Sequence, residues 1–364
     1  MVCTQVLERR WWACLWLLTG TQALLPGLIV RRGGHRALSL VVPGAVDQIA
    51  EPAVRQFSPA VPAEAVGEIQ EQAARAMFQQ LAAADLAVPT SVASSGRATA
   101  SFYASPAIQG DRPPAVVCLH GFDSSCLEWR RLVPLLEEAA VADIFALDVH
   151  GWGFVGHSPD SGTEFSAVAK REHLKAFVDQ VVGTDRPVVL MGASLGGALA
   201  IEFAAAYPDT VAKTVLIDPQ GFVDGAGPAA SLPRFLARLG VRVLGSPQLR
   251  SMANQMAYSD KETFATEDAM KIGRLHVLCE GWEDANLEYM CSGGFQPSLK
   301  VPEVKCQTLV LWGRDDEILD PALYAERFLE EVPNSRLQFV DNCGHVPHLE
   351  QPKVTASHIV DFLR

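Results

Sequence analysis

The chain has 364 residues, of which 49% are hydrophobic, and this is enough apolar material for one large core with a small second layer. Its formal net charge of −12 argues against a nucleic-acid surface, which needs clustered Lys and Arg, and favours solubility instead. The eight cysteines include no CxxC pair and no metal-like spacing with histidine, so we expect reduced thiols with structural roles.

Residues 1–46 have the composition of a targeting leader. No acidic residue occurs from Arg9 to Val46, and the stretch WWACLWLLTGTQALLPGLIV (11–30) carries no charge. A basic flank, an apolar middle and small residues at Thr21 and Ala23 suit a cleavable signal, and the basic, acid-free RRGGHRALSL that follows resembles a transit peptide. This order predicts delivery to a plastid (chloroplast). The alternatives are a membrane anchor, because 20 uncharged residues can just span a bilayer, or secretion.

Residues 47–97 are rich in alanine and acidic residues and predict a helical lead-in. The stretch EIQEQAARAMFQQLAAADL (68–86) has the composition of a helix packed on the surface of the following domain. We assign no function to this lead-in.

From residue 98 the pattern changes to apolar runs separated by helical stretches. The runs are AVVCLHG (115–121), IFALDVHG (144–151), PVVLMG (187–192), KTVLID (213–218), QTLVLWG (307–313) and RLQFV (336–340). Near-continuous apolar runs are typical of parallel strands that helices cover on both faces. The predicted fold is therefore a doubly wound, mostly parallel α/β sheet, with residues 98–220 and 303–364 as the two parts of its core. Such sheets bind ligands beyond the carboxyl ends of their strands.

One interval breaks this alternation and predicts an inserted helical cap over residues 221–302. About 80 residues stand where a single helix normally joins two strands. The composition is helical with glycine and proline interruptions, and it supplies several aromatic residues and methionines. We expect most of these side chains to pack within the cap and a minority to line a pocket.

The stretch LMGASLGGALA (190–200) predicts a nucleophile elbow at Ser194. The apolar run before the serine indicates a buried strand, and the alanine-rich run after it indicates a helix. A sharp turn between the two crowds the positions two before and two after the serine, which are Gly192 and Gly196.

Serine needs a base within hydrogen-bond reach and a carboxylate that orients that base. His345 lies in a loop after the run 336–340, at the same sheet edge as Ser194, and is the predicted base. His120, His150 and His157 lie in turns and favour structural roles, and His348 favours a place at the start of a helix. Three residues compete as the acid: Asp315, Asp316 and Asp218.

The oxyanion hole needs two backbone N–H groups that face the developing tetrahedral oxygen, and the loss of one such donor typically costs about 3 kcal/mol. The predicted donors are the N–H groups of Leu195, directly after the nucleophile, and Phe122, in the turn HGFDSSCLEW.

Five segments together resemble the α/β-hydrolase superfamily in its capped, lipase- and esterase-like branch. They are the HG turn at 119–122, LDVHGWGF (147–154), GASLGG (192–197), WGRDDE (312–317) and GHVPHLEQP (344–352). The resemblance covers residues 100–364, and HGFDSSCLEWRRL and AKREHL make it greatest to plant and algal plastid α/β-hydrolases. It implies that the acid stands three residues after the glycine that ends its strand, which selects Asp316 after Gly313. It also implies an acyl-enzyme mechanism on Ser194, His345 and Asp316, with no metal or organic cofactor.

Two departures narrow the implied chemistry. Dehalogenase and epoxide-hydrolase relatives have an aspartate at the elbow, and carbon-carbon bond hydrolases have a tryptophan after the catalytic histidine, where this chain has Val346. Ester cleavage is therefore favoured, with a small, apolar ester admitted under the cap and with membrane association only through the leader. The alternatives are a carbon-carbon or thioester hydrolase on the same triad and a small-molecule binding protein of this fold without turnover.

Overall fold

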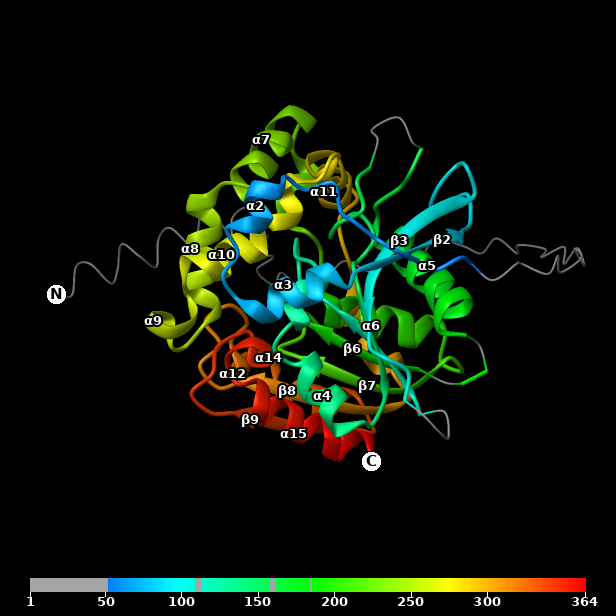
Figure 1. Cartoon of the computed structure of the whole chain (residues 1–364). Coiled ribbons are helices and arrows are strands. Elements are labelled where there is room, and N and C mark those ends of the chain that lie inside the picture. The colour runs from blue at the N-terminus through cyan, green and yellow to red at the C-terminus, as the bar shows by residue number, and fades with distance from the viewer. Residues whose placement is uncertain (1–51, 109–112, 158–161, 184, 187) are drawn as a thin grey trace, which may run out of the picture.

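The structure is a computed structural model that describes residues 52–108, 113–157, 162–183, 185–186 and 188–364 (Figure 1). The predicted leader, residues 1–46, lies outside the described residues. Every helix within the described ranges is too short or too polar to cross a lipid bilayer.

The described strands form one sheet of nine strands in the order β1-β2-β3-β5-β4-β6-β7-β8-β9. The strands are β1 (Arg55–Gln56), β2 (Ala82–Ala87), β3 (Arg97–Ala104), β4 (Ala115–Leu119), β5 (Asp143–Leu147), β6 (Val188–Ala193), β7 (Val211–Ile217), β8 (Gln307–Gly313) and β9 (Ser335–Val340). Neighbours from β5 to β9 in this order are parallel, whereas β1, β2 and β3 join the edge as antiparallel strands. The carboxyl ends of β6 to β9 therefore meet along one sheet edge.

Helices cover both faces of the sheet and also form a separate group beyond it. They are α2 (Ala63–Gly67), α3 (Gln72–Gln79), α4 (Val133–Ala139), α5 (Ala167–Phe177), α6 (Leu195–Ala206), α7 (Arg234–Leu244), α8 (Pro247–Ala257), α9 (Lys261–Phe264), α10 (Glu267–Arg274), α11 (Trp282–Cys291), α12 (Pro321–Tyr324), α13 (Arg327–Glu331), α14 (Pro347–Glu350) and α15 (Pro352–Leu363), with short turns such as η1 (Cys126–Trp129) and η4 (Leu275–Leu278).

Alternate side chains of β4 enter two separate hydrophobic clusters. Val117 and Leu119 pack in the cluster that contains α5 and α6, whereas Val116 and Cys118 pack in the cluster that contains α3, α4 and α15. Because every β4 side chain is buried, its sequence is apolar throughout rather than alternating. The predicted doubly wound α/β sheet is confirmed.

The lead-in is only partly helical, which corrects the predicted helix over 68–86. Helix α3 ends at Gln79, and β2 pairs with β3 from the register Ala82↔Phe102 to Ala87↔Arg97. Alanine favours a helix by propensity, but here its small side chains are buried between a strand neighbour and the packed helices, and tertiary packing decides the conformation.

Helices α7 to α11 lie between β7 and β8 in the chain and extend from the top to the left side of the molecule in Figure 1, outside the sheet. We refer to residues 221–302 as the cap. The six cysteines of the described ranges are unpaired thiols.

Candidate active site

Ser194 occupies a sharp turn between β6 and α6. Its backbone has a φ of 50° and a ψ of −117°, a strained conformation for a residue with a side chain. A Cβ atom on Gly192 would lie 2.3 Å from the carbonyl oxygen of Gly196, and one on Gly196 would lie 2.0 Å from that of Leu119. Both glycines are therefore required by close backbone approach, as the sequence predicts. The Ser194 hydroxyl makes no hydrogen bond to another described residue.

His345 and Asp316 form a buried pair in the loops after β9 and β8. His345 Nδ1 lies 2.8 Å from Asp316 Oδ2. Asp316 Oδ1 accepts the N–H groups of Ile318 (2.7 Å) and Leu319 (2.9 Å), and the indole of Trp312 donates to Oδ2. Burial acts to raise the pKa of Asp316, but His345 and the two backbone donors outweigh it and hold the pKa below its usual range. Asp316 is therefore an ionised acceptor for one ring nitrogen of His345.

The other two candidate acids hydrogen-bond to groups other than His345. Asp315 is exposed, and its carboxylate accepts a hydrogen bond from the Ser259 hydroxyl at 2.9 Å. Asp218 is fully buried after β7, and its Oδ1 accepts the N–H of Gly313 at 2.9 Å. Burial and the neighbouring Asp316 charge raise the pKa of Asp218 well above its usual value, so this carboxyl keeps its proton.

We expect Asp218→Asn to gain stability relative to the wild type as pH rises. Unfolded Asp218 loses its proton near pH 4, whereas the folded chain keeps it, so the wild-type free energy of unfolding falls by up to about 1.4 kcal/mol per pH unit above that point. Asparagine keeps the acceptor for Gly313 and has no proton to lose. Urea unfolding at about pH 5 and about pH 8 measures the difference between the two proteins. An equal difference at both pH values would contradict a protonated Asp218.

Asp218, Asp316 and His345 also offer one oxygen or nitrogen atom each within 4.8 Å of one another, a spacing that suits a metal ion. The hydrogen bonds described above already engage His345 Nδ1 and both oxygens of Asp316. A protonated Asp218 is also a poor ligand, because ligating carboxylates must be ionised. The donor set fits a hydrogen-bonded acid and base better than a metal centre.

The two candidate oxyanion donors flank Ser194. Leu195 is the first residue of α6, and Phe122 follows Gly121, whose added Cβ would lie 3.5 Å from the Ser194 Cβ. In the described part of the chain, neither the Phe122 N–H nor the Leu195 N–H donates to a protein acceptor. Both residues line the cavity that contains Ser194.

A cavity of about 480 Å³ connects Ser194 with the cap. Its walls are apolar and come mainly from α7 and the loops beside it. Leu236, Leu239 and Val243 of α7 line this cavity and are also 42%, 58% and 51% exposed, so its mouth is hydrophobic. Large apolar side chains at the surface often mark a binding site for an apolar partner.

Two glutamates that were not predicted from the sequence accept backbone N–H groups in the loops that carry Phe122 and His345. Glu128 accepts the N–H of Gly121 and contacts His348, and Glu350 accepts the N–H of Gly344 at 2.7 Å. His120 is buried, and its Nε2 accepts the N–H of Val149, which fits the structural role predicted for it. The only sequence signal for the glutamates was their place inside segments that the family resemblance covers.

The model of the "Alpha/beta hydrolase family" matches residues 116–358, two-thirds of the chain. The chain is an α/β hydrolase. This α/β hydrolase is 36% identical over 297 residues to the alpha/beta hydrolase domain-containing protein VTE7 of Arabidopsis thaliana, covering 82% of this chain and 88% of that one. It is also 26% identical over 267 residues to the monoacylglycerol lipase ABHD6 of Rattus norvegicus, covering 69% and 75%.

Solved structures share the fold of this α/β hydrolase. A thermophilic esterase from Thermogutta terrifontis matches with a TM-score of 0.60 and 21% identity, covering 77% of this chain and 97% of that one. A meta-cleavage product hydrolase from Pseudomonas fluorescens matches with a TM-score of 0.58 and 17% identity, covering 76% and 96%. Because its family relatives include lipases, a hydrolase activity is supported for this chain.

Proposed function

We propose that this α/β hydrolase is a serine hydrolase that cleaves a carboxylic ester through an acyl-enzyme intermediate. The observation that carries the proposal is the 2.8 Å contact between His345 and the ionised Asp316, at the sheet edge where Ser194 also lies. A histidine oriented by a carboxylate and a serine on a strained turn are the groups that a nucleophilic hydroxyl needs, and here they stand at one sheet edge.

In the proposed mechanism, Ser194 Oγ attacks the ester carbonyl carbon while His345 Nε2 takes the hydroxyl proton. The N–H groups of Phe122 and Leu195 stabilise the negative charge that develops on the carbonyl oxygen. The tetrahedral intermediate collapses, and His345 returns the proton to the departing alcohol oxygen. Water, deprotonated by His345, then attacks the acyl carbon. His345 returns this proton to Ser194 Oγ as the bond between Oγ and the acyl carbon breaks and the acid is released. Asp316 stays ionised throughout and stabilises the imidazolium.

The lining of the cavity supports the inference that the substrate carries an apolar group. The lining is hydrophobic apart from a few polar residues, among them Gln220 and Glu317. A relative that carries the name monoacylglycerol lipase supports the same inference. The test is turnover of p-nitrophenyl esters by the full-length protein. Cleavage that improves from acetyl toward longer acyl chains supports the proposal, and no cleavage of any ester by the folded protein contradicts it.

Gly240→Leu is expected to shorten the preferred acyl chain. Gly240 lies on α7 and lines the cavity, and a Cβ at this position meets no atom within 4 Å. A leucine side chain has room here and occupies space that a long acyl chain would use. We expect kcat/KM to fall by about 10-fold or more on dodecanoate relative to butyrate. Gly67→Leu serves as the control, because a Cβ at Gly67 also meets no atom within 4 Å but Gly67 lies outside the cavity. It leaves the ratio of kcat/KM on dodecanoate to kcat/KM on butyrate unchanged. An unchanged ratio in Gly240→Leu would place the acyl group elsewhere.

We also propose that the leader directs the protein to a plastid. The acid-free composition of residues 9–46 supports this, and so does the similarity to a plant protein over 82% of the chain. Residues 1–46 fused to a fluorescent protein test the proposal in cells of an alga with a complex plastid, whose plastid leaders have this order of signal and transit segment. Fluorescence confined to the endomembrane system or the cell exterior would contradict it.

A further inference from the structure

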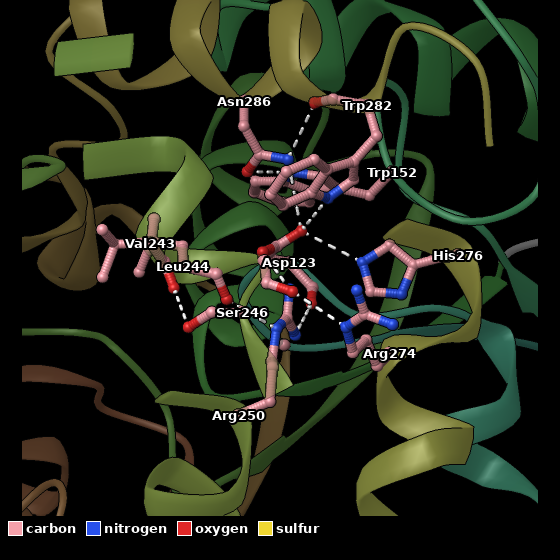
Figure 2. A network of polar contacts seen from close by, with 12 residues as sticks. Asp123, Trp152, Val243, Leu244, Ser246, Arg250, Arg274, His276, Trp282 and Asn286 are labelled. Atoms are coloured by element: carbon pink, nitrogen blue, oxygen red, sulfur yellow. Dashed lines mark hydrogen bonds and ion pairs between the residues drawn. The ribbon is translucent and has the colours of Figure 1, made fainter. Parts of the chain in front are cut away.

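The residue directly after the proposed oxyanion donor Phe122 is held by the cap. Asp123 is 2% exposed and has a left-handed backbone with a φ of 48°, a conformation that a residue with a side chain adopts only when its surroundings impose it. Its side chain points into a group of cap residues, which Figure 2 shows.

Four cap side chains converge on the Asp123 carboxylate. Oδ1 accepts hydrogen bonds from His276 Nε2 at 3.0 Å, the Trp282 indole at 2.7 Å and the Asn286 amide at 3.2 Å. Oδ2 forms an ion pair with the guanidinium of Arg250. These donors come from η4, α11 and α8, so a single core carboxylate joins three elements of the cap (Figure 2).

The backbone of Asp123 is held in the same way. Arg250 Nη1 donates to the Asp123 carbonyl oxygen at 2.8 Å, and Arg250 Nε donates to the carbonyl oxygen of Leu244 at the end of α7. Within the described ranges, every hydrogen bond of Asp123 comes from a cap residue. Burial acts to raise the pKa of Asp123, but Arg250 and His276 outweigh it and keep the carboxyl ionised.

The core holds the other side of this turn. The N–H of Gly121 lies 3.2 Å from both oxygens of Glu128. Phe122 therefore stands between one residue fixed by the core and one fixed by the cap. The ring of Phe122 adds a second link, because it lies 5.4 Å from the ring of Trp152, whose indole donates to Asn286 Oδ1.

We propose that Asp123 is a positioning residue that makes the geometry of the oxyanion hole depend on the docked cap. The proposal rests on the proposed function for the role of the Phe122 N–H. When the cap side chains bind Asp123, the turn from Gly121 to Asp123 is fixed at both ends and the Phe122 N–H is held toward the space above Ser194. When the cap moves away, the strained turn loses the hydrogen bonds and the ion pair that hold Asp123, and the Phe122 N–H loses its fixed position. Catalysis is thereby restricted to the state in which the cap covers the substrate.

Variants on the cap side test this without changing the core turn. Trp282→Phe removes the indole donor but keeps an aromatic ring, and Arg250→Met removes the guanidinium but keeps an extended side chain. The matched control is Arg238→Met, which breaks ion pairs with Glu283 and Asp284 inside the cap and does not touch Asp123.

The first readout is the rate constant for inactivation of the full-length protein by a short-alkyl fluorophosphonate, whose phosphoryl oxygen needs the oxyanion hole and whose alkyl group is too small to need the cap cavity. We expect the inactivation rate constant per active site to fall by about 10- to 100-fold in Trp282→Phe and Arg250→Met. This is a part of the loss of rate seen when an oxyanion-hole donor is deleted. We expect less than a twofold change in Arg238→Met. A purely structural role would lower the melting temperature and the active fraction but leave the rate constant per active site unchanged, and that result would overturn the proposal.

The second readout is hydrogen exchange of the backbone amides at residues 121–124, which does not need activity. We expect faster exchange in both cap variants and wild-type exchange in Arg238→Met. Unchanged exchange in the two cap variants would overturn the positioning role even if the enzyme is a serine hydrolase. If exchange rises but the wild type does not react with the fluorophosphonate, the coupling of the turn to the cap stands and the proposed function fails.

Discussion

Ser194→Ala is expected to abolish ester hydrolysis, with kcat falling by about 10⁶-fold on any ester that the wild type cleaves. No other described residue at this sheet edge offers a hydroxyl on a strained strand-to-helix turn beside the cavity. The backbone hydrogen bonds of Ser194 to Ile217, Gly197 and Gln220 do not involve its side chain, so the fold survives the change.

Ser357→Ala, at an exposed serine on α15, is the matched control and retains wild-type activity. Activity is measured with the preferred p-nitrophenyl ester, and the melting temperature shows that both variants are folded. If Ser194→Ala retained more than about one hundredth of wild-type kcat, the proposed nucleophile would be wrong.

Asp316→Asn is expected to lower kcat by about 10⁴-fold with little change in KM. The asparagine side chain has nearly the same shape, but an amide N–H₂ facing His345 Nδ1 favours the ring tautomer that cannot accept the Ser194 proton. The amide also carries no charge to stabilise the imidazolium that forms during the reaction.

Asp315→Asn provides the control for this change, because it alters the adjacent residue, whose carboxylate is exposed and bonds only to Ser259 among the contacts described above. We expect its kcat to stay within about twofold of the wild type, as for a surface change away from the reacting atoms. A reversed order of effects, with Asp315→Asn inactive and Asp316→Asn active, would assign the acid to Asp315.

The sequence predicted the parallel part of the sheet well because its strands are buried on both faces. Runs such as AVVCL in β4 have no polar position, and short apolar runs that end in glycine or a polar residue have few other interpretations. The same reasoning failed at the antiparallel edge. There the alanines of β2 (AAADLA) favour a helix, and β3 (RATASFYA) mixes strand-favouring residues with Arg, Ala and Ser and has no continuous apolar run. The pairing of β3 with β2 and β5 does not show in this pattern.

The candidate site was predictable as a set of residue types in loops, but not as a set of contacts. From the sequence, Asp315, Asp316 and Asp218 were all candidates for the acid that orients His345. The structure shows that His345 Nδ1 contacts Asp316. No pattern in the sequence indicates that Asp218 is buried beside Asp316, because this proximity comes from the alignment of β7 with β8.

The proposed positioning role of Asp123 was not predictable from the sequence, since its hydrogen-bond partners lie 127 to 163 residues away in the chain. A sequence pattern reports local preference and spacing, whereas this network depends on how the cap folds back over the core.

The most direct test of Ser194 as an activated nucleophile is the site at which a fluorophosphonate modifies the protein covalently. The full-length protein is treated with the reagent, digested and analysed by mass spectrometry, with Ser194→Ala treated in parallel. We expect one phosphonyl group on the peptide that contains Ser194 and none on the variant. A folded wild-type protein that carries no phosphonyl group, or carries it on a different residue, would contradict the claim that Ser194 is an activated nucleophile.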